Sequence, residues 1–249
     1  MAHEQFGTLW SGREELLYRL RYFVNAYPSL YMPLARVRHR DPQQTFPIVT
    51  RDTELLIEGF GRAGSTFAQF AFQSAQARPV KIAHHTHAAA QVIRAVEWGI
   101  PSIVIVRDPC QAALSHMARH QVSAEAGLRA WIRFHRRILP YRSRLVITSF
   151  ETMKQDFGAV IQCLNQKFGT NFGAWVHSRE NEAKIFEQIR LRNLRLGDEV
   201  TPERLRDLAI PTPERDALKA DFGPQLARPE LERLRKRAMT LYIEILQEK

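Results

Sequence analysis

The stretch Glu54-Leu-Leu-Ile-Glu-Gly-Phe-Gly-Arg-Ala-Gly-Ser-Thr66 decides the fold, because its character changes twice within thirteen residues. It begins with a short apolar run that is typical of a buried strand and passes through three glycines that are typical of a tight turn. A helical pattern then begins at Ser65 and continues to about residue 75. A strand, a glycine-rich turn and a helix in this order direct backbone N–H groups and the positive end of the helix dipole toward one point. The stretch therefore predicts a phosphate-binding loop in an α/β fold.

This loop nearly satisfies the nucleoside-triphosphatase motif G-x-x-x-x-G-K-[ST] between Gly59 and Thr66. Ser65 stands where that motif has the lysine that reaches the β- and γ-phosphates. The replacement of that lysine by Ser65 argues against hydrolysis of ATP or GTP. Arg62, within the loop, offers a cation that would approach a phosphate at a different angle. A tight strand–helix turn with a surface arginine remains the alternative interpretation.

The rest of the chain repeats strands and helices in alternation, which is typical of a mainly parallel sheet with right-handed crossovers. The spacing predicts further strands over 80–83, 102–106 and 144–148. It predicts helices over 12–25, 87–98 and 123–139, another that begins at Asp108-Pro109, and helices from 149 to the end, with an irregular connector over 28–53. We therefore expect an α/β fold with a mainly parallel sheet flanked by helices, a P-loop-like phosphate-binding core and a helical C-terminal third. No linker interrupts the chain, so residues 1–249 are interpreted as a single domain.

The composition is that of a soluble globular protein, with 45% apolar and 25% charged residues among 249. The 36 Lys and Arg exceed the 26 Asp and Glu by ten, and this surplus favours an anionic partner. Residues 51–150 hold 13 basic and 6 acidic residues, a surplus of seven, so the charge lies within the fold and not in a basic tail. A disordered nucleic-acid-binding arm is therefore not expected, and nucleic acid is not the favoured partner.

Cysteine content and hydropathy predict the compartment. Cys110 and Cys163 are interpreted as two unpaired thiols in a reducing environment. The longest aliphatic run, 103–106, is far shorter than the ~20 residues of a membrane helix. The first residues show no signal peptide. We expect a cytoplasmic protein without a membrane partner.

A second anion site is predicted at Arg107, which follows the strand 102–106, together with Ser115 eight residues further on. An arginine at the carboxyl end of a strand and a serine on the next helix can face the crevice where such sheets bind ligands. A guanidinium and a hydroxyl suit a phosphate monoester. A structural ion pair between Arg107 and Asp108 is the alternative.

Together these features resemble the sulfotransferases that use 3′-phosphoadenosine 5′-phosphosulfate (PAPS). Residues 61–67, Gly-Arg-Ala-Gly-Ser-Thr-Phe, are similar to that family's P-K-S-G-T-T-W loop. Residues 103–109, Ile-Val-Ile-Val-Arg-Asp-Pro, with Ser115, are similar to its 3′-phosphate motif. Phe150-Glu151 is similar to its Y-E-D-L stretch, so the resemblance spans roughly 54–170.

The resemblance implies a role for each matching residue. Arg62 would hold the 5′-phosphosulfate and stabilise charge on the leaving oxygen. Phe67 would stack on adenine, and Arg107 and Ser115 would bind the 3′-phosphate. The residues that would cradle the 5′-phosphate are Ala63, Gly64, Ser65 and Thr66. The chain departs from the family in its first two loop residues. The family's C-terminal R-K-G element is not recognisable in this sequence. Arg215 or Lys219 could take its place, and solvated charges on a helix are the alternative interpretation of these two residues.

Three histidines, His84, His85 and His87, follow the predicted strand 80–83. By its spacing from Arg107, His85 matches the family's catalytic histidine, and imidazole suits the removal of a proton from an attacking hydroxyl. His84, His87 and Glu151 remain alternatives for the base. A structural role and a metal site for the histidines also stay open, although no further ligand lies close in sequence and no metal is expected.

We therefore expect a sulfotransferase that moves a sulfuryl group from PAPS to an acceptor hydroxyl or amine by in-line attack, with PAP as product. A nucleotide-binding, kinase-like protein and a non-catalytic binder of RNA or another polyanion are the alternatives. The acceptor is expected to be a small molecule or a peptide. An acidic acceptor is suggested by four arginines of the predicted helix 123–139: Arg129, Arg133, Arg136 and Arg137.

Overall fold

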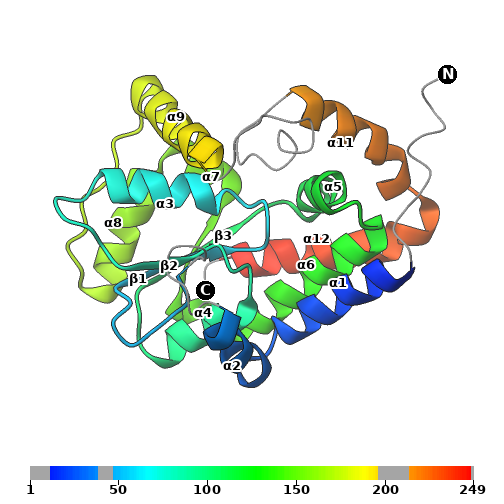
Figure 1. Ribbon diagram of the computed structural model, residues 1–249, viewed down its shortest axis with the longest axis horizontal. Coiled ribbons are helices and arrows are strands. Elements are labelled where there is room, and N and C mark those ends of the chain that lie inside the picture. The colour runs from blue at the N-terminus through cyan, green and yellow to red at the C-terminus, as the bar shows by residue number, and fades with distance from the viewer. Residues whose placement is uncertain (1–11, 39–46, 196–212, 248–249) are drawn as a thin grey trace.

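The computed structural model describes residues 12–38, 47–195 and 213–247, and its centre is a sheet of four parallel strands. The strands lie in the order β2-β1-β3-β4 (Figure 1). Their bounds are β1 Leu55–Gly59, β2 Ile82–His84, β3 Ser102–Val106 and β4 Val146–Ser149. The predicted α/β fold with a parallel sheet is confirmed.

Helices cover both faces of this sheet, as expected for parallel strands. Alternate residues of β1 and β3 point to opposite faces: Leu56 and Val104 pack in one apolar cluster, Ile57 and Ile103 in the other. The first face is covered by α1 Gly12–Val24, α4 Ala89–Glu97, α5 Pro109–His120, α6 Ala124–Ile138 and α12 Glu232–Leu246. The second is covered by α3 Ser65–Ser74, α7 Phe150–Gln155, α8 Phe157–Phe168 and α9 Arg179–Arg195. The remaining helices of the described residues are α2 Pro28–Arg38, α11 Pro213–Leu226 and the 3-10 turns Leu139–Arg144 and Pro229–Leu231.

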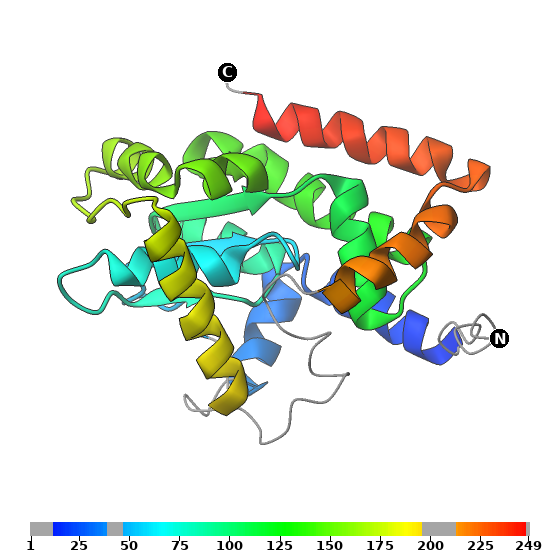
Figure 2. The same cartoon turned by 90° about the horizontal axis from the view of Figure 1, so that it is seen from above.

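The last helix packs as its apolar spacing predicts. Ala238, Leu241 and Ile245 of α12 are buried, and α12 contacts α5, α6 and β4. Seen from above (Figure 2), α12 runs along one edge of the molecule and α9 lies at the opposite edge. The helical C-terminal third therefore contributes to both faces of the sheet.

The prediction of an irregular connector over 28–53 is wrong for its first part, because α2 occupies Pro28–Arg38. Pro28 stands at the first helical position, where its missing N–H is not needed. Pro33 lies inside the helix, but Tyr31, Met32 and Ala35 are buried against the start of α4, and this packing outweighs the local preference. The sequence Ser11-Gly-Arg-Glu14 matches a capping box for the first helix, but Ser11 lies outside the described residues.

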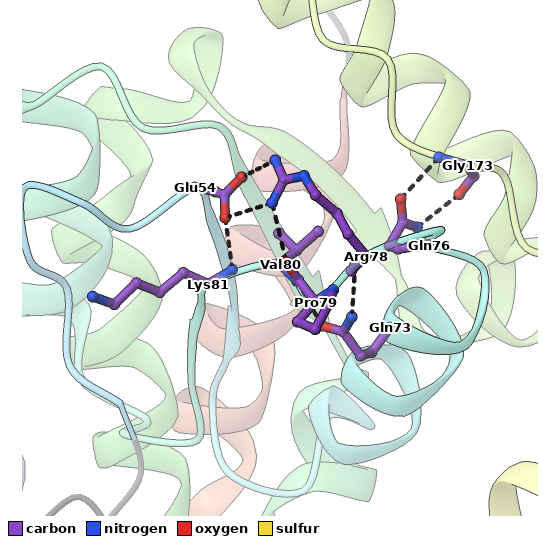
Figure 3. A network of polar contacts seen from close by, with 8 residues as sticks. All are labelled: Glu54, Gln73, Gln76, Arg78, Pro79, Val80, Lys81 and Gly173. Carbon is purple, nitrogen blue, oxygen red and sulfur yellow. Dashed lines mark hydrogen bonds and ion pairs between the residues drawn. The ribbon is translucent and has the colours of Figure 1, made fainter.

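A polar network at the amino ends of the strands fixes the connection between α3 and β2 (Figure 3). The Glu54 carboxylate accepts hydrogen bonds from the Arg78 guanidinium and, at 3.0 Å, from the Lys81 N–H. Gln76 exchanges two hydrogen bonds with the backbone of Gly173, at 2.9 and 3.0 Å. These contacts hold the end of the sheet that lies opposite the glycine loop.

Cys110 and Cys163 are both free. Among the described helices, none combines the length and apolar character needed to cross a membrane.

Candidate functional site

A cavity of about 270 Å³ lies at the carboxyl ends of the strands, where the glycine loop meets α3, α5, α9 and α11. Parallel α/β sheets bind ligands at this end. The cavity is lined by Arg62, Gly64, Ser65, Thr66, Phe67, His85, His87, Arg107, Arg119, Phe150, Met153, Lys154, Glu182, Phe186 and Lys219. The structure thus gathers both predicted phosphate motifs and two of the three histidines around one space.

The glycine loop turns into α3 through a left-handed residue. Gly64 has a φ of 90° at the N-cap of α3, and a Cβ there would lie 2.8 Å from Met153 Cε. Arg62, two residues earlier, also has a positive φ, of 70°. This geometry places the unpaired N–H groups at the start of a ten-residue helix on the cavity, where they favour an anion.

Direct contacts join the two predicted phosphate motifs. Arg107 Nη1 donates to the Arg62 carbonyl at 3.0 Å, and Arg62 Nε donates to Ser115 Oγ at 3.3 Å. Ser115 is 1% exposed and is not among the residues that line the cavity, and the same is true of the buried Ala63. Segments 45 to 53 residues apart in the chain therefore form one cationic corner.

Arg107 is held in place from two further sides. Its guanidinium lies over the Phe150 ring, 4.6 Å from the centroid, and its carbonyl accepts from Trp131 Nε1 at 3.2 Å. Burial lowers the pKa of Arg107, yet an arginine in a protein stays charged. Asp108 caps α5 by accepting from the Gln111 N–H at 2.9 Å, which gives this carboxylate a structural role apart from the cavity.

The histidine segment that follows β2 is strained and polar. His85 and His87 both have positive φ, of 62° and 51°. Both ring nitrogens of His85 contact protein groups: Nε2 lies 2.5 Å from Thr66 Oγ1, and Nδ1 lies 2.5 Å from His84 Nδ1. Residues held in sparsely populated backbone conformations gather at functional sites, and three of the four non-glycine residues with positive φ in the described chain line this cavity.

His87 differs from His84 and His85 because one of its ring nitrogens is hydrogen-bonded to the backbone. Nδ1 lies 2.9 Å from the Gly59 carbonyl, which can only accept, so Nδ1 carries the proton. Glu58 Oε2 lies 3.7 Å from the same nitrogen. The neutral ring therefore keeps Nε2 as an acceptor for a proton from a ligand in the cavity.

Glu58, which the sequence did not single out, holds the histidine segment in place. It is fully buried on β1, and its carboxylate accepts from the Thr86 N–H at 2.7 Å, the Thr86 hydroxyl at 2.6 Å and the His87 N–H at 3.2 Å. The sequence offered one signal for this residue: a glutamate that directly follows an apolar run expected to be buried. Such a signal is informative because a buried charge needs hydrogen-bond partners.

Burial sets the protonation of this group. It lowers the pKa of His87 to about 4 and of His84 to about 3, and it holds the pKa of His85 well below its ordinary value. It raises the pKa of Glu58 to about 7 against the opposing effect of its hydrogen bonds. At neutral pH the three imidazoles are therefore neutral.

The cavity is strongly cationic. Five basic side chains line it against one acid, Glu182; they are Arg62, Arg107, Arg119, Lys154 and Lys219. Arg119 was missed, although its spacing of four residues from Ser115 places both on one face of a helix. Lys219 reaches the cavity and pairs with Asp216 at 2.6 Å. The side chain of Arg215 lies outside what the structure describes.

Aromatic rings form another part of the wall. Phe67 packs edge-on against Trp175 and at a tilt against Phe186, each with 5.5 Å between centroids. Phe67, Phe150 and Phe186 all line the cavity. They supply the apolar surface that an aromatic ligand group needs beside the cationic corner.

Glu151, the remaining candidate for the base, and the buried His116 do not line the cavity. Glu151 is exposed. His116 is buried behind the loop, stacked on Phe60 at 4.4 Å, with Nδ1 3.1 Å from the Tyr18 hydroxyl. Within the described parts of the chain, no cluster of three or more His, Cys, Asp or Glu could hold a metal ion.

Comparison with known proteins finds a resemblance to solved structures alone. No protein-family model matches the chain, and no curated protein matches its sequence. Among solved structures, a mouse sulfotransferase, SULT7A1 complexed with PAP, is 12% identical with a TM-score of 0.41, over 76% of this chain and 90% of that one.

Proposed function

We propose that the protein is a sulfotransferase that moves a sulfuryl group from PAPS to an acceptor hydroxyl or amine. The observation that supports this best is the contact of Arg107 and Ser115 with the loop residue Arg62. A ligand with two separate phosphate groups and an aromatic base needs two cationic positions and an apolar wall. In support of this, cationic side chains from the glycine loop and from the end of β3 line the cavity together with the Phe67, Phe150 and Phe186 rings.

In this proposal each wall of the cavity holds one part of the cofactor. Gly64, Ser65 and Thr66, with the Ala63 backbone, would bind the 5′-phosphate, and Arg62 would stabilise charge on the leaving oxygen. Arg107 would bind the 3′-phosphate, the buried Ser115 hydroxyl would hold the Arg62 side chain in place, and Phe67 would contact adenine. When bound, PAPS supplies the activated sulfuryl group.

Two histidines are placed to take the acceptor's proton. The resemblance assigns this role to His85, whose two ring nitrogens already contact Thr66 and His84. The contacts favour His87 instead, because its Nδ1 is bonded to Gly59 and its Nε2 can face a ligand. We therefore propose His87 as the base, with His85 in place to position the Thr66 hydroxyl.

Thermal shift with PAP, Mg-ATP and RNA in parallel tests the nucleotide assignment. A ligand at 100 times its dissociation constant stabilises a fold by about 2.7 kcal/mol, so PAP should raise the melting temperature clearly. Arg107→Ala should abolish that shift. Arg129→Ala is the matched control, because Arg129 lies on α6 outside the cavity, in an exposed pair with Glu125.

Each alternative makes a different prediction in this experiment. A larger shift with Mg-ATP than with PAP would indicate a kinase-like protein. Affinity for RNA that falls steeply with salt, without a preference for PAP, would indicate a polyanion binder. If PAP binds, transfer of labelled sulfuryl from PAPS to a panel of phenols, alcohols and amines tests the activity itself, and no transfer to any would contradict it.

A further inference from the structure

The first two helices carry an apolar surface that faces outward. Seven of the ten large apolar side chains that are exposed in the described chain belong to α1 and α2, and Leu16 is the most exposed of these at 65%. Figure 1 shows both helices along the lower edge of the molecule. We call this the N-terminal surface; its apolar members are Leu16, Leu17, Leu20, Phe23, Leu30, Leu34 and Val37.

The same spacing occurs in both helices. Leu16, Leu20 and Phe23 follow one another at intervals of four and three residues, and Leu30, Leu34 and Val37 repeat this pattern. At 3.6 residues per turn, each set forms one stripe along its helix. The sequence spacing correctly predicts the first helix, yet these leucines do not reach the core.

Each helix is attached to the protein by its opposite side. Tyr18 and Tyr22 of α1 are buried in the main apolar cluster, and Tyr31, Met32 and Ala35 of α2 are buried against α4. The exposed stripes are therefore not the faces by which α1 and α2 pack on the core. They form a second apolar face on helices that are already anchored.

Positive charge surrounds the stripes. Residues 12–38 hold five arginines and two glutamates, a surplus of three, and one glutamate, Glu15, pairs with Arg19. Helix α6 adds more: Arg133 lies over the Phe23 ring at 5.5 Å, and Arg137 lies over the Tyr27 ring at 4.6 Å. In the sequence these α6 arginines suggested an acidic acceptor. In the structure they lie beside α1 and are not among the residues that line the cavity.

We propose that the N-terminal surface docks on an anionic lipid bilayer. Outward Leu, Phe and Val side chains gain free energy by entering the acyl boundary, and flanking arginines are attracted to anionic headgroups. A second copy of the chain is a poorer occupant, because pairing two such surfaces would bring arginines together. The expectation of no membrane partner rests on the absence of a membrane-spanning segment. A pair of helices that binds the surface of a bilayer needs no such segment. This proposal is independent of the proposed function.

Co-sedimentation with vesicles tests the proposal. We expect the full chain to bind vesicles of equal parts phosphatidylcholine and phosphatidylglycerol, and not vesicles of phosphatidylcholine alone. The double variant Leu20→Glu/Leu34→Glu should bind roughly tenfold more weakly or worse, because it places two carboxylates where apolar groups would be buried. Val176→Glu is the matched control: Val176 is 70% exposed but lies outside the N-terminal surface, so binding should be unchanged.

Thermal melting of the variants in the absence of vesicles checks that they fold. Failure to bind either kind of vesicle, equal binding to both kinds, or binding that the double variant retains would overturn the proposal. A dimer in size-exclusion chromatography that the double variant abolishes, without vesicle binding, would show that the occupant is a second copy and would also overturn it.

Discussion

His87 and Glu58 form the most informative pair of side chains in the cavity region. A carboxylate buried on β1 holds the backbone of the histidine segment, and the Gly59 carbonyl fixes the tautomer of the ring. Burial lowers the pKa of His87, so the ring is unprotonated at neutral pH. A low pKa also makes it a weaker base, and Glu58, 3.7 Å from Nδ1, would stabilise the imidazolium once a proton has been taken. This arrangement is the reason for proposing His87 as the base among neighbouring histidines, a choice that spacing along the chain leaves open.

Replacing the two histidines separately distinguishes their roles. His87→Asn should lower kcat by roughly a hundredfold or more, the usual contribution of a general base, while PAP affinity changes little. His85→Asn should weaken PAP binding more than it lowers kcat, because it frees the Thr66 hydroxyl. Steady-state rates and PAP titration on both variants provide the measurement. The opposite pattern would return the role of base to His85.

Glu58→Gln tests whether the carboxylate acts through His87. The amide keeps the shape of the side chain but cannot stabilise a positive ring, so the variant should shift the pH profile of kcat. A lower melting temperature with an unchanged pH profile would show that Glu58 is only structural.

At the scale of elements, the turn from β1 into α3 is what converts a strand into a binding site. It depends on Gly64, whose φ of 90° is unfavourable for any residue with a Cβ. Gly59 is needed for a second reason, because a Cβ there would lie 2.5 Å from the Ile105 carbonyl oxygen of β3. The loop can approach both the neighbouring strand and a ligand only because these positions lack side chains.

Gly64→Ala should therefore lower stability by about 1–2 kcal/mol for the left-handed backbone and should also impair PAP binding. The added methyl group would press on Met153 and Phe150, both of which line the cavity. Gly99→Ala is the matched control, because Gly99 has a φ of 70° with open space around it. Urea unfolding should show a loss of stability in both variants, and calorimetry should show weaker PAP binding in the first alone. Equal PAP affinity in both would contradict the loop assignment.

At the scale of the whole molecule, buried histidines make the fold sensitive to acid. Burial lowers the pKa of four of them to about 3 or 4: His84, His87, His120 and His135. Between their unfolded pKa of about 6.5 and these values, the unfolded chain binds more protons than the native one, so stability is lost as the pH falls. Glu58 acts in the opposite direction, because its raised pKa lets the native state hold one extra proton below about pH 7.

The four histidines together outweigh Glu58, so the free energy of unfolding should fall as the pH is lowered from 7 to 5. Each net proton contributes about 1.4 kcal/mol per pH unit. Urea titrations across this range measure the slope, and His135→Gln should reduce it by about one proton without touching the cavity. A flat profile would show that these imidazoles are not buried as the structure places them.

The sequence by itself determined the features that depend on neighbours along the chain. The strand 102–106, the Asp108 cap with Pro109 and the glycine turn follow from local propensity and capping, and the structure has them at the predicted places. Both phosphate motifs are local patterns as well, so Arg62 and Arg107 could be selected before any contact was known.

Only the tertiary structure decided which side chains share a space and which faces are covered. The outward stripe of α1 and the helix α2 depend on what packs against them, and helical spacing is the same for a core face and a solvent face. The Glu58–His87 pair and the entry of Arg119, Phe186 and Lys219 into one cavity join segments far apart in the sequence. Burial and proximity arise when helices pack on the sheet, so no local pattern can specify them.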